Sequence, residues 1–208
     1  ISIDDLLRKV EYIGDRLFGY TEKLVFSFAD ITEYRKVKSN LEKNGINYHV
    51  WTEEEMLIFA ERLSELNKKW GYELATCGEK IDIEQFGIKH NHCVDDNLMI
   101  KLAYKDEDLM KLLGVEIKQQ GTSLSLFDEE IIPSDAIMLS ENKYAIKKKN
   151  NKDKGQRQFC GCIVSKDIGE YNTCPHLCEY CYANASKEVA VLNWKQHKNN
   201  PLGESILG

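Results

Sequence analysis

The sequence predicts an α/β fold, a partial or modified (β/α) barrel, followed by a cysteine-rich segment at the C-terminus. Over the first two-thirds of the chain, helical periodicity alternates with short apolar runs, and the stretches between these runs are long enough for helical crossovers. Five of the seven cysteines fall in the last quarter of the chain. We therefore divide the chain into a barrel-like domain over residues 1–146, a basic linker over residues 147–158, and a cysteine-rich segment with a terminal helix over residues 159–208.

The barrel-like domain begins with helices that alternate with a strand. Hydrophobic side chains at helical spacing predict a first helix that ends near Gly19, with Ser2 as its N-cap. The run KLVFSFAD, residues 23–30, predicts a strand covered on both faces, and residues 31–45 predict a second helix. The hydrophobic stripe of the first helix consists of Ile3, Leu6, Leu7, Val10, Ile13 and Leu17.

A third helix and a second strand follow. Thr52, with Glu55 three residues later, is a capping box and predicts that a helix begins there. The run YELATCG, residues 72–78, predicts a second buried strand, and a helical crossover between two such strands predicts parallel pairing. The remaining predicted elements are short helices at residues 82–86, 95–103 and 106–113 and a final helix at residues 186–200, whereas residues 119–146 show no clear periodicity.

Composition and charge exclude several classes of protein. The chain has 208 residues, of which 42% are hydrophobic and 30% charged, and a net charge of −6, which argues against a protein that coats nucleic acid. No apolar run approaches about 18 residues, so we expect no membrane span. The cysteines are odd in number and clustered, with no visible export signal, which fits metal-bound thiolates in a reducing cytoplasm. The chain opens with Ile1 directly at a helical pattern, so we expect its true N-terminus to lie upstream and residues 1–146 to be the C-terminal part of the barrel-like domain.

The basic linker carries six positive charges in twelve residues, namely Lys147, Lys148, Lys149, Lys152, Lys154 and Arg157. A polar run of this kind is typical of a solvated surface loop. The alternative is a patch that faces phosphate or nucleic acid. The sequence allows nucleic acid as a partner but does not favour it.

Cys174, Cys178 and Cys181, which we name the cysteine triad, form a C-x3-C-x2-C motif with no fourth cysteine beside it. A zinc knuckle normally supplies its ligands as close pairs two residues apart, with the second pair elsewhere. Ferredoxin-type runs use successive two-residue gaps and further cysteines to complete four ligands. The triad can instead hold three corners of an iron–sulfur cube, because nothing adjacent supplies the fourth ligand.

The segment CPHLCEYC, residues 174–181, resembles the signature loop of the radical S-adenosylmethionine superfamily, including the aromatic Tyr180 before the last cysteine. The wider stretch RQFCGCIVSKDIGEYNTCPHLCEYCYAN, residues 157–184, resembles an uncharacterised bacterial family, a domain of unknown function with such a cysteine cluster near its C-terminus. The upstream part resembles that family more weakly, through its element order and the segment CGEKIDIEQFGIKHNHCVD. The chain contains no Gly-Gly pair, although many superfamily members use one to hold the methionyl amino group.

The resemblance implies that the triad holds a [4Fe–4S] cluster whose fourth iron binds S-adenosylmethionine. One-electron reduction would cleave this cofactor to methionine and a 5′-deoxyadenosyl radical, which abstracts hydrogen from a substrate that the sequence does not identify. Tyr180 would lie near the adenine, or would only pack the loop. An electron-donor protein would be a further partner of such an enzyme.

Four cysteines remain, Cys77, Cys93, Cys160 and Cys162, which we name the cysteine quartet. Four is the number that closes a second [4Fe–4S] cluster or a structural zinc site. Cys160 and Cys162 are one residue apart, so they can face one metal but cannot easily form a relaxed disulfide. Alternatively, Cys77 and Cys93 are small buried hydrophobic residues. A second site would require Cys77, at the end of a predicted strand, to lie close to Cys160 or Cys162.

Two functions from different classes therefore remain open. One is a radical S-adenosylmethionine enzyme. The other is a non-catalytic iron–sulfur or zinc-binding module with a structural or redox-sensing role, or one that associates with nucleic acid through the basic linker.

Overall fold

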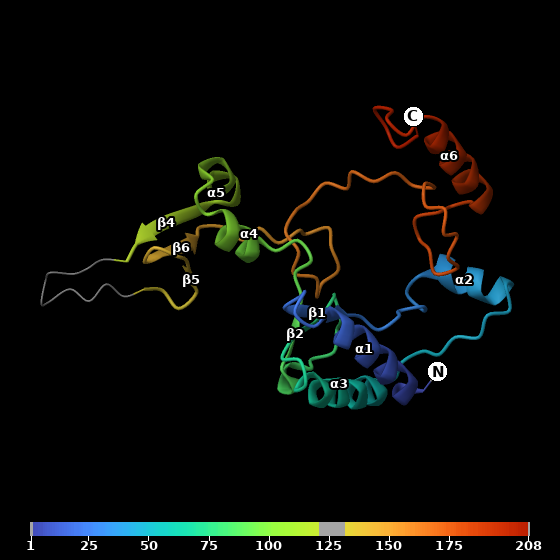
Figure 1. Ribbon diagram of the computed structural model, residues 1–208, viewed down its shortest axis with the longest axis horizontal. Helices are drawn as coiled ribbons and strands as arrows, with labels where there is room; N and C mark the ends of the chain where they lie inside the picture. Colours follow the sequence, from blue (N-terminus) through green and yellow to red (C-terminus); the bar gives the residue numbers. More distant parts are fainter. Residues whose placement is uncertain (1, 121–131, 208) are drawn as a thin grey trace, which may run out of the picture. The chain divides into compact units, whose positions relative to one another are not determined.

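The computed structural model describes residues 2–120 and 132–207. Figure 1 labels the helices and strands in chain order. They are α1 (Ile3–Leu17), β1 (Lys23–Phe26), α2 (Arg35–Lys43), α3 (Glu53–Asn67), β2 (Glu73–Thr76), the 3-10 helix η1 (Glu84–Phe86), β3 (Ile88–His90), α4 (Asp96–Ala103), α5 (Glu107–Leu113), β4 (Val115–Gln119), β5 (Ile137–Met138), β6 (Lys143–Lys147) and α6 (Lys187–Asn199). Residues 121–131, part of the region without predicted periodicity, lie outside the described residues. No described helix combines the length and the apolarity needed to cross a bilayer.

The chain divides into two compact units, and two of the four boundaries between them fall within α1 and α3. One unit combines Ile1–Leu7, Phe28–Leu63 and Lys166–Gly208 and contains the cysteine triad, so we name it the triad unit. The other combines Arg8–Ser27 and Ser64–Ser165 and contains the cysteine quartet, so we name it the quartet unit. The functional division of the chain at residues 146 and 158 stays a prediction.

Two capping boxes determine where α1 and α3 begin. The Ser2 hydroxyl accepts a hydrogen bond from the backbone N–H of Asp5 (3.1 Å), and the Asp5 carboxylate accepts one from the backbone N–H of Ser2 (3.2 Å). Thr52 and Glu55 make the same reciprocal pair at 3.2 and 2.9 Å. Each box satisfies two backbone donors that have no partner inside the helix, and both predicted helix starts are confirmed.

The quartet unit contains a parallel sheet of three strands in the order β1-β2-β3. The central strand β2 has a neighbour on each side, and Leu74, Ala75 and Thr76 are buried within it. Strand β1 is an edge strand in which Val25 is 40% exposed, so the prediction of a strand covered on both faces is wrong. The predicted parallel pairing of β1 with β2 is confirmed.

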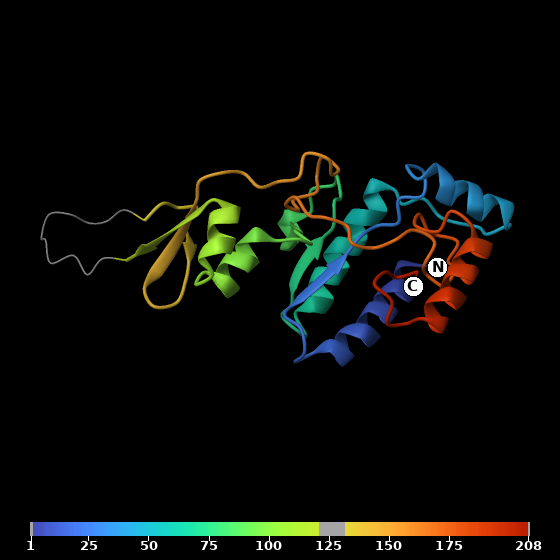
Figure 2. The same cartoon turned by 90° about the horizontal axis from the view of Figure 1, so that it is seen from above.

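The same unit contains an antiparallel sheet in the order β4-β6-β5. Ile117, Ala145 and Ile137 are register partners across its three strands, so their side chains share one face. Helices α4 and α5 pack on this face, as Figures 1 and 2 show. The core between helices and sheet consists of Ile100, Met110, Leu113, Ile137, Ala145 and Ile163, with Ile117 packed against it.

The predicted (β/α) barrel is wrong. A barrel needs parallel strands to continue around the axis until the last strand pairs with the first. Only β1, β2 and β3 pair in parallel, and β4 joins a separate antiparallel sheet, so the described residues form two small sheets and no closed barrel. The fold is mixed α/β.

The triad unit has two small apolar clusters. The rings of Phe28, Trp51 and Phe59 pack in tilted and edge-to-face arrangements, with ring centroids 4.8 to 5.8 Å apart. The second cluster consists of Ile31, Val37 and Leu41 with Tyr48 packed against it. This second cluster fixes α2, which positions the loop that carries the triad.

Candidate metal centres

The cysteine triad lies in a loop that precedes α6 and contains no helix or strand. Figure 1 shows this loop, in orange to red, between α2 and α6. Cys174 and Cys178 are exposed and Cys181 is half-buried. Leu177 has a φ of +54°, a left-handed conformation that produces a tight turn between the first two cysteines. The loop therefore presents three free thiols to an external group.

Asn184 ties the two ends of the triad together. Its backbone N–H donates to the Cys181 Sγ (3.4 Å), and its Nδ2 donates to the carbonyl oxygen of Cys174 (2.8 Å). From α2, the Lys36 ammonium donates to the carbonyl oxygens of Asn184 and Tyr182. Asn184 is only 8% exposed, and its buried Oδ1 has no hydrogen-bond partner among the described residues. A buried acceptor without a partner among the described residues thus lies beside the triad.

A hollow of about 320 Å³ opens next to the triad, between α2, the loop and the start of α6. Cys178 and Cys181 line it together with Lys36 and Asn184. Glu179 also lines the hollow, but its carboxylate is already paired with Lys187 and the Asn44 amide. The hollow is therefore polar, with most of its charges compensated.

Tyr180 is 47% exposed on the same loop. Its ring is accessible to a ligand, and its contact with adenine stays a prediction. His176, between the first two cysteines, is exposed.

The cysteine quartet begins at the carboxyl end of the parallel sheet. Cys77 directly follows β2, and its backbone N–H donates to the carbonyl oxygen of Phe26 (3.1 Å). Cys93 lies on the loop after β3, where Asn91 N–H donates to the carbonyl oxygen of Thr76 (2.7 Å). Because carboxyl ends of parallel strands meet at one edge of a sheet, the two thiols are neighbours, and their Sγ atoms are 3.5 Å apart.

Cys162 reaches this edge from the far side of the basic linker. Its Sγ accepts hydrogen bonds from the backbone N–H groups of Cys93 (3.1 Å) and Val94 (3.4 Å). The next residue, Ile163, donates its N–H to the carbonyl oxygen of Val94 (3.1 Å). Cys160 is buried like Cys162, and their side chains interact. Cys93 therefore contacts both Cys77 and Cys162 and connects them. From the sequence, Cys93 could be assigned only to a loop.

The quartet thiols differ in how easily they ionise. Desolvation of its sulfur by the surrounding chain raises the pKa of Cys93 to about 11, and the neighbouring Cys77 thiol adds to this effect. Burial also raises the pKa of Cys160. Burial acts in the same direction on Cys162, but hydrogen bonds from the backbone N–H of Val94 and from its other neighbours outweigh it and lower the pKa. Cys162 consequently ionises more easily than Cys93 or Cys160.

A group of three further ligand side chains lies beside the quartet. His92, Asp95 and Asp96 have ligand atoms within 4.8 Å of one another. Asp95 is the N-cap of α4, and Asp96, with a side chain 4% exposed, binds Lys147 (3.2 Å) and Asn151 (3.0 Å). Burial acts to raise the pKa of Asp96, but the hydrogen bonds from Asn151 and Lys147 lower it below its usual value. These carboxylates already have structural partners.

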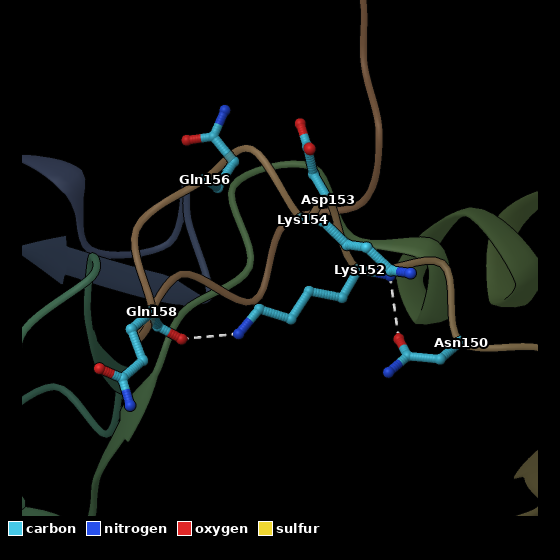
Figure 3. Close-up of a pocket in the computed structure, with 6 residues that line it drawn as sticks. All are labelled: Asn150, Lys152, Asp153, Lys154, Gln156 and Gln158. Carbon is cyan, nitrogen blue, oxygen red and sulfur yellow. Dashed lines mark hydrogen bonds between the residues drawn. The ribbon is translucent and has the colours of Figure 1, made fainter.

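The basic linker uses several of its charges within the chain. Lys148 pairs with Glu116 (2.7 Å), and the Lys149 ammonium donates to the carbonyl oxygen of Leu112 (2.6 Å). Figure 3 shows the Lys152 ammonium donating to the carbonyl oxygen of Gln158 (2.6 Å) at a shallow polar hollow of about 350 Å³. Glu116 therefore compensates the charge of Lys148, whereas Lys149 and Lys152 keep their charge and are held against the chain by carbonyl oxygens.

No curated protein matches the chain. No solved structure matches it either. Residues 1–183 match the family described as Domain of unknown function (DUF1848), a match that includes the whole triad and the whole quartet. The chain therefore belongs to the DUF1848 family.

Proposed function

We propose that the chain is an iron–sulfur protein that uses S-adenosylmethionine in radical chemistry, with the triad holding three irons of a [4Fe–4S] cluster. The observation that carries the proposal is the triad itself. Three free thiols lie within eight residues, two of them exposed, beside a polar hollow. Thiolates are the usual protein ligands of such clusters, and three of them leave one iron open.

The triad supplies three thiolates from one short loop and has no fourth cysteine beside it. Three thiolates leave one coordination position open, whereas a structural zinc site normally has four protein ligands. The triad therefore suits a cluster with one open iron better than a structural ion.

The residues around the triad would bind and orient the cofactor. Asn184 and Lys36 hold the loop in one conformation, which reduces the entropy lost when the thiolates bind metal. The unpaired Oδ1 of Asn184 would accept a hydrogen bond from the amino group of S-adenosylmethionine, because a buried acceptor without a partner is costly. This contact would replace the absent Gly-Gly segment. The accessible ring of Tyr180 would stack on the adenine.

The chemistry itself would come from the cofactor pair, which supplies a 5′-deoxyadenosyl radical for hydrogen abstraction after one-electron reduction. The chain's own contribution is to hold the thiolates and to position S-adenosylmethionine in the hollow.

The test is the release of 5′-deoxyadenosine by anaerobically purified, chemically reduced protein with added S-adenosylmethionine. We expect about four irons per triad-bound cluster and 5′-deoxyadenosine in the wild type, and loss of both in Cys178→Ser. His176→Ala, which changes an exposed side chain of the same loop, should retain both. Protein without iron contradicts the whole proposal. Iron-loaded protein that releases no more 5′-deoxyadenosine than Cys178→Ser contradicts the enzymatic part and favours a non-catalytic module.

A further inference from the structure

We infer that the cysteine quartet is a second, independent metal site that binds a single tetrahedral ion, zinc, through four thiolates. This inference does not rest on the proposed function, because none of the quartet residues belongs to the triad or lines its hollow. The site would be structural, since four protein ligands leave no position open for substrate.

The spacing of the first two ligands favours a single ion. The Sγ atoms of Cys77 and Cys93 are 3.5 Å apart, close to the separation of about 3.8 Å that tetrahedral zinc imposes on its thiolates. A disulfide would need these sulfurs at about 2.05 Å. The observed separation is a non-bonded contact between two thiols and not a disulfide.

Hydrogen-bond donors already point at the quartet sulfurs. The Cys162 Sγ accepts from two backbone N–H groups, those of Cys93 and Val94. The Asn91 amide donates to the Cys93 Sγ (3.4 Å). Donors of this kind orient thiolate ligands and stabilise their negative charge when a metal is bound.

The four ligands come from three separate segments. Cys77 follows β2, Cys93 follows β3, and Cys160 and Cys162 lie beyond the basic linker. A shared ion would cross-link these segments and hold the chain beyond the linker against the carboxyl edge of the parallel sheet. Cross-links between distant segments stabilise a fold most when the loops that they close are long.

The quartet also has a route by which an ion can enter. Cys160 and Cys162 are 7% and 9% exposed, whereas Cys77 is half-buried and Cys93 exposed. Since no three quartet sulfurs lie within 4.8 Å of one another in the described chain, binding requires the outer thiols to turn inward.

The test combines a metal count with X-ray absorption at the zinc edge on the whole protein. We expect about one zinc per chain, with about four sulfur ligands at about 2.3 Å. Cys93→Ser should lower the zinc content at least tenfold and leave the iron content unchanged. Cys178→Ser should lower the iron content and leave the zinc content unchanged. Val164→Ala, at an exposed position just beyond Cys162, is the control that keeps both metals.

Several results would overturn the inference. Wild-type protein without zinc does so even if a variant fails to fold, because the wild-type count needs no substitution. About eight irons per chain, half of them lost in Cys93→Ser, would identify a second cluster instead. A Cys77–Cys93 disulfide found by mass spectrometry, or full zinc content in Cys93→Ser, also contradicts it. Failure of the proposed function affects iron and 5′-deoxyadenosine and leaves the zinc count untouched.

Discussion

The triad and the quartet differ in where their thiols come from and in how far solvent reaches them. The triad comes from eight consecutive residues, and two of its thiols are exposed beside a hollow. The quartet comes from three distant segments, and two of its thiols are buried. A site formed by one loop can leave a coordination position open to a ligand. A site that joins distant segments through four protein thiols leaves no position open and suits a structural ion.

The largest expected effect in this comparison is on stability, from Cys162→Ala in the quartet. The substitution removes a ligand and leaves the N–H groups of Cys93 and Val94 without their acceptor. We expect the melting temperature to fall by about 10 °C, since 1 kcal/mol corresponds to roughly 2–4 °C in a chain of this size. Calorimetry measures this, with Val164→Ala as control. A shift below about 2 °C would show that the quartet does not hold the fold together.

Asp96→Asn tests the polar contacts that Asp96 makes beside the quartet. It weakens the contacts to Lys147 and Asn151 at a buried position, so we expect a loss of about 2 kcal/mol in the free energy of unfolding at neutral pH, measured by urea denaturation. The pKa of Asp96 is lower in the folded chain than the unfolded value of about 3.9. Its stabilisation is therefore present above that value and is lost as the pH falls through the folded pKa.

The wild type and Asp96→Asn should consequently converge in acid. Asp108→Asn, at an exposed position on α5, should change stability by less than about 0.5 kcal/mol. A difference between wild type and Asp96→Asn that is independent of pH would contradict the assigned ion pair.

Asn184→Ala tests whether Asn184 holds the loop that carries the triad. It removes the amide contact to the carbonyl oxygen of Cys174, and one hydrogen bond of about 1.4 kcal/mol corresponds to a tenfold change. We expect a chelator to remove iron about ten times faster than from the wild type. The bleaching of the cluster absorption measures this rate. Lys195→Ala, exposed on α6, should bleach at the wild-type rate. Equal rates in Asn184→Ala and wild type would show that Asn184 does not hold the loop.

Thr52→Ala has the smallest expected effect. It removes the capping box of α3 and should cost about 1 kcal/mol, a fall of about 2–4 °C in melting temperature. Glu54→Gln, exposed in the same turn, is the control. Neither iron nor zinc content should change. A loss of either metal would mean that helix capping and metal binding are coupled.

Local signals predicted much of the fold. The capping residues Ser2 and Thr52 and the amphipathic stripes placed the long helices, because helix starts depend on neighbours in sequence. The barrel was wrong because strand pairing depends on distant residues. Val115 and Ile117 alternate with polar neighbours, a strand signal that was present in the sequence and was missed.

For the candidate sites too, local features could be predicted from the sequence and contacts between distant residues could not. The spacing of the triad is visible in the sequence, and counting cysteines indicated the quartet. Lys36 and Asn184 could not be predicted to meet, because they are 148 residues apart in the chain. Asp96 likewise acquires its role only from Lys147 and Asn151, which the fold brings to it.

The contrast between an open and a closed centre is tested most directly by electron paramagnetic resonance of the reduced protein with and without S-adenosylmethionine. An open iron at the triad predicts that the cofactor changes the spectrum of the reduced cluster in the wild type and equally in Cys93→Ser. A spectrum that the cofactor leaves unchanged, or reduced protein with no iron–sulfur signal, would contradict the account.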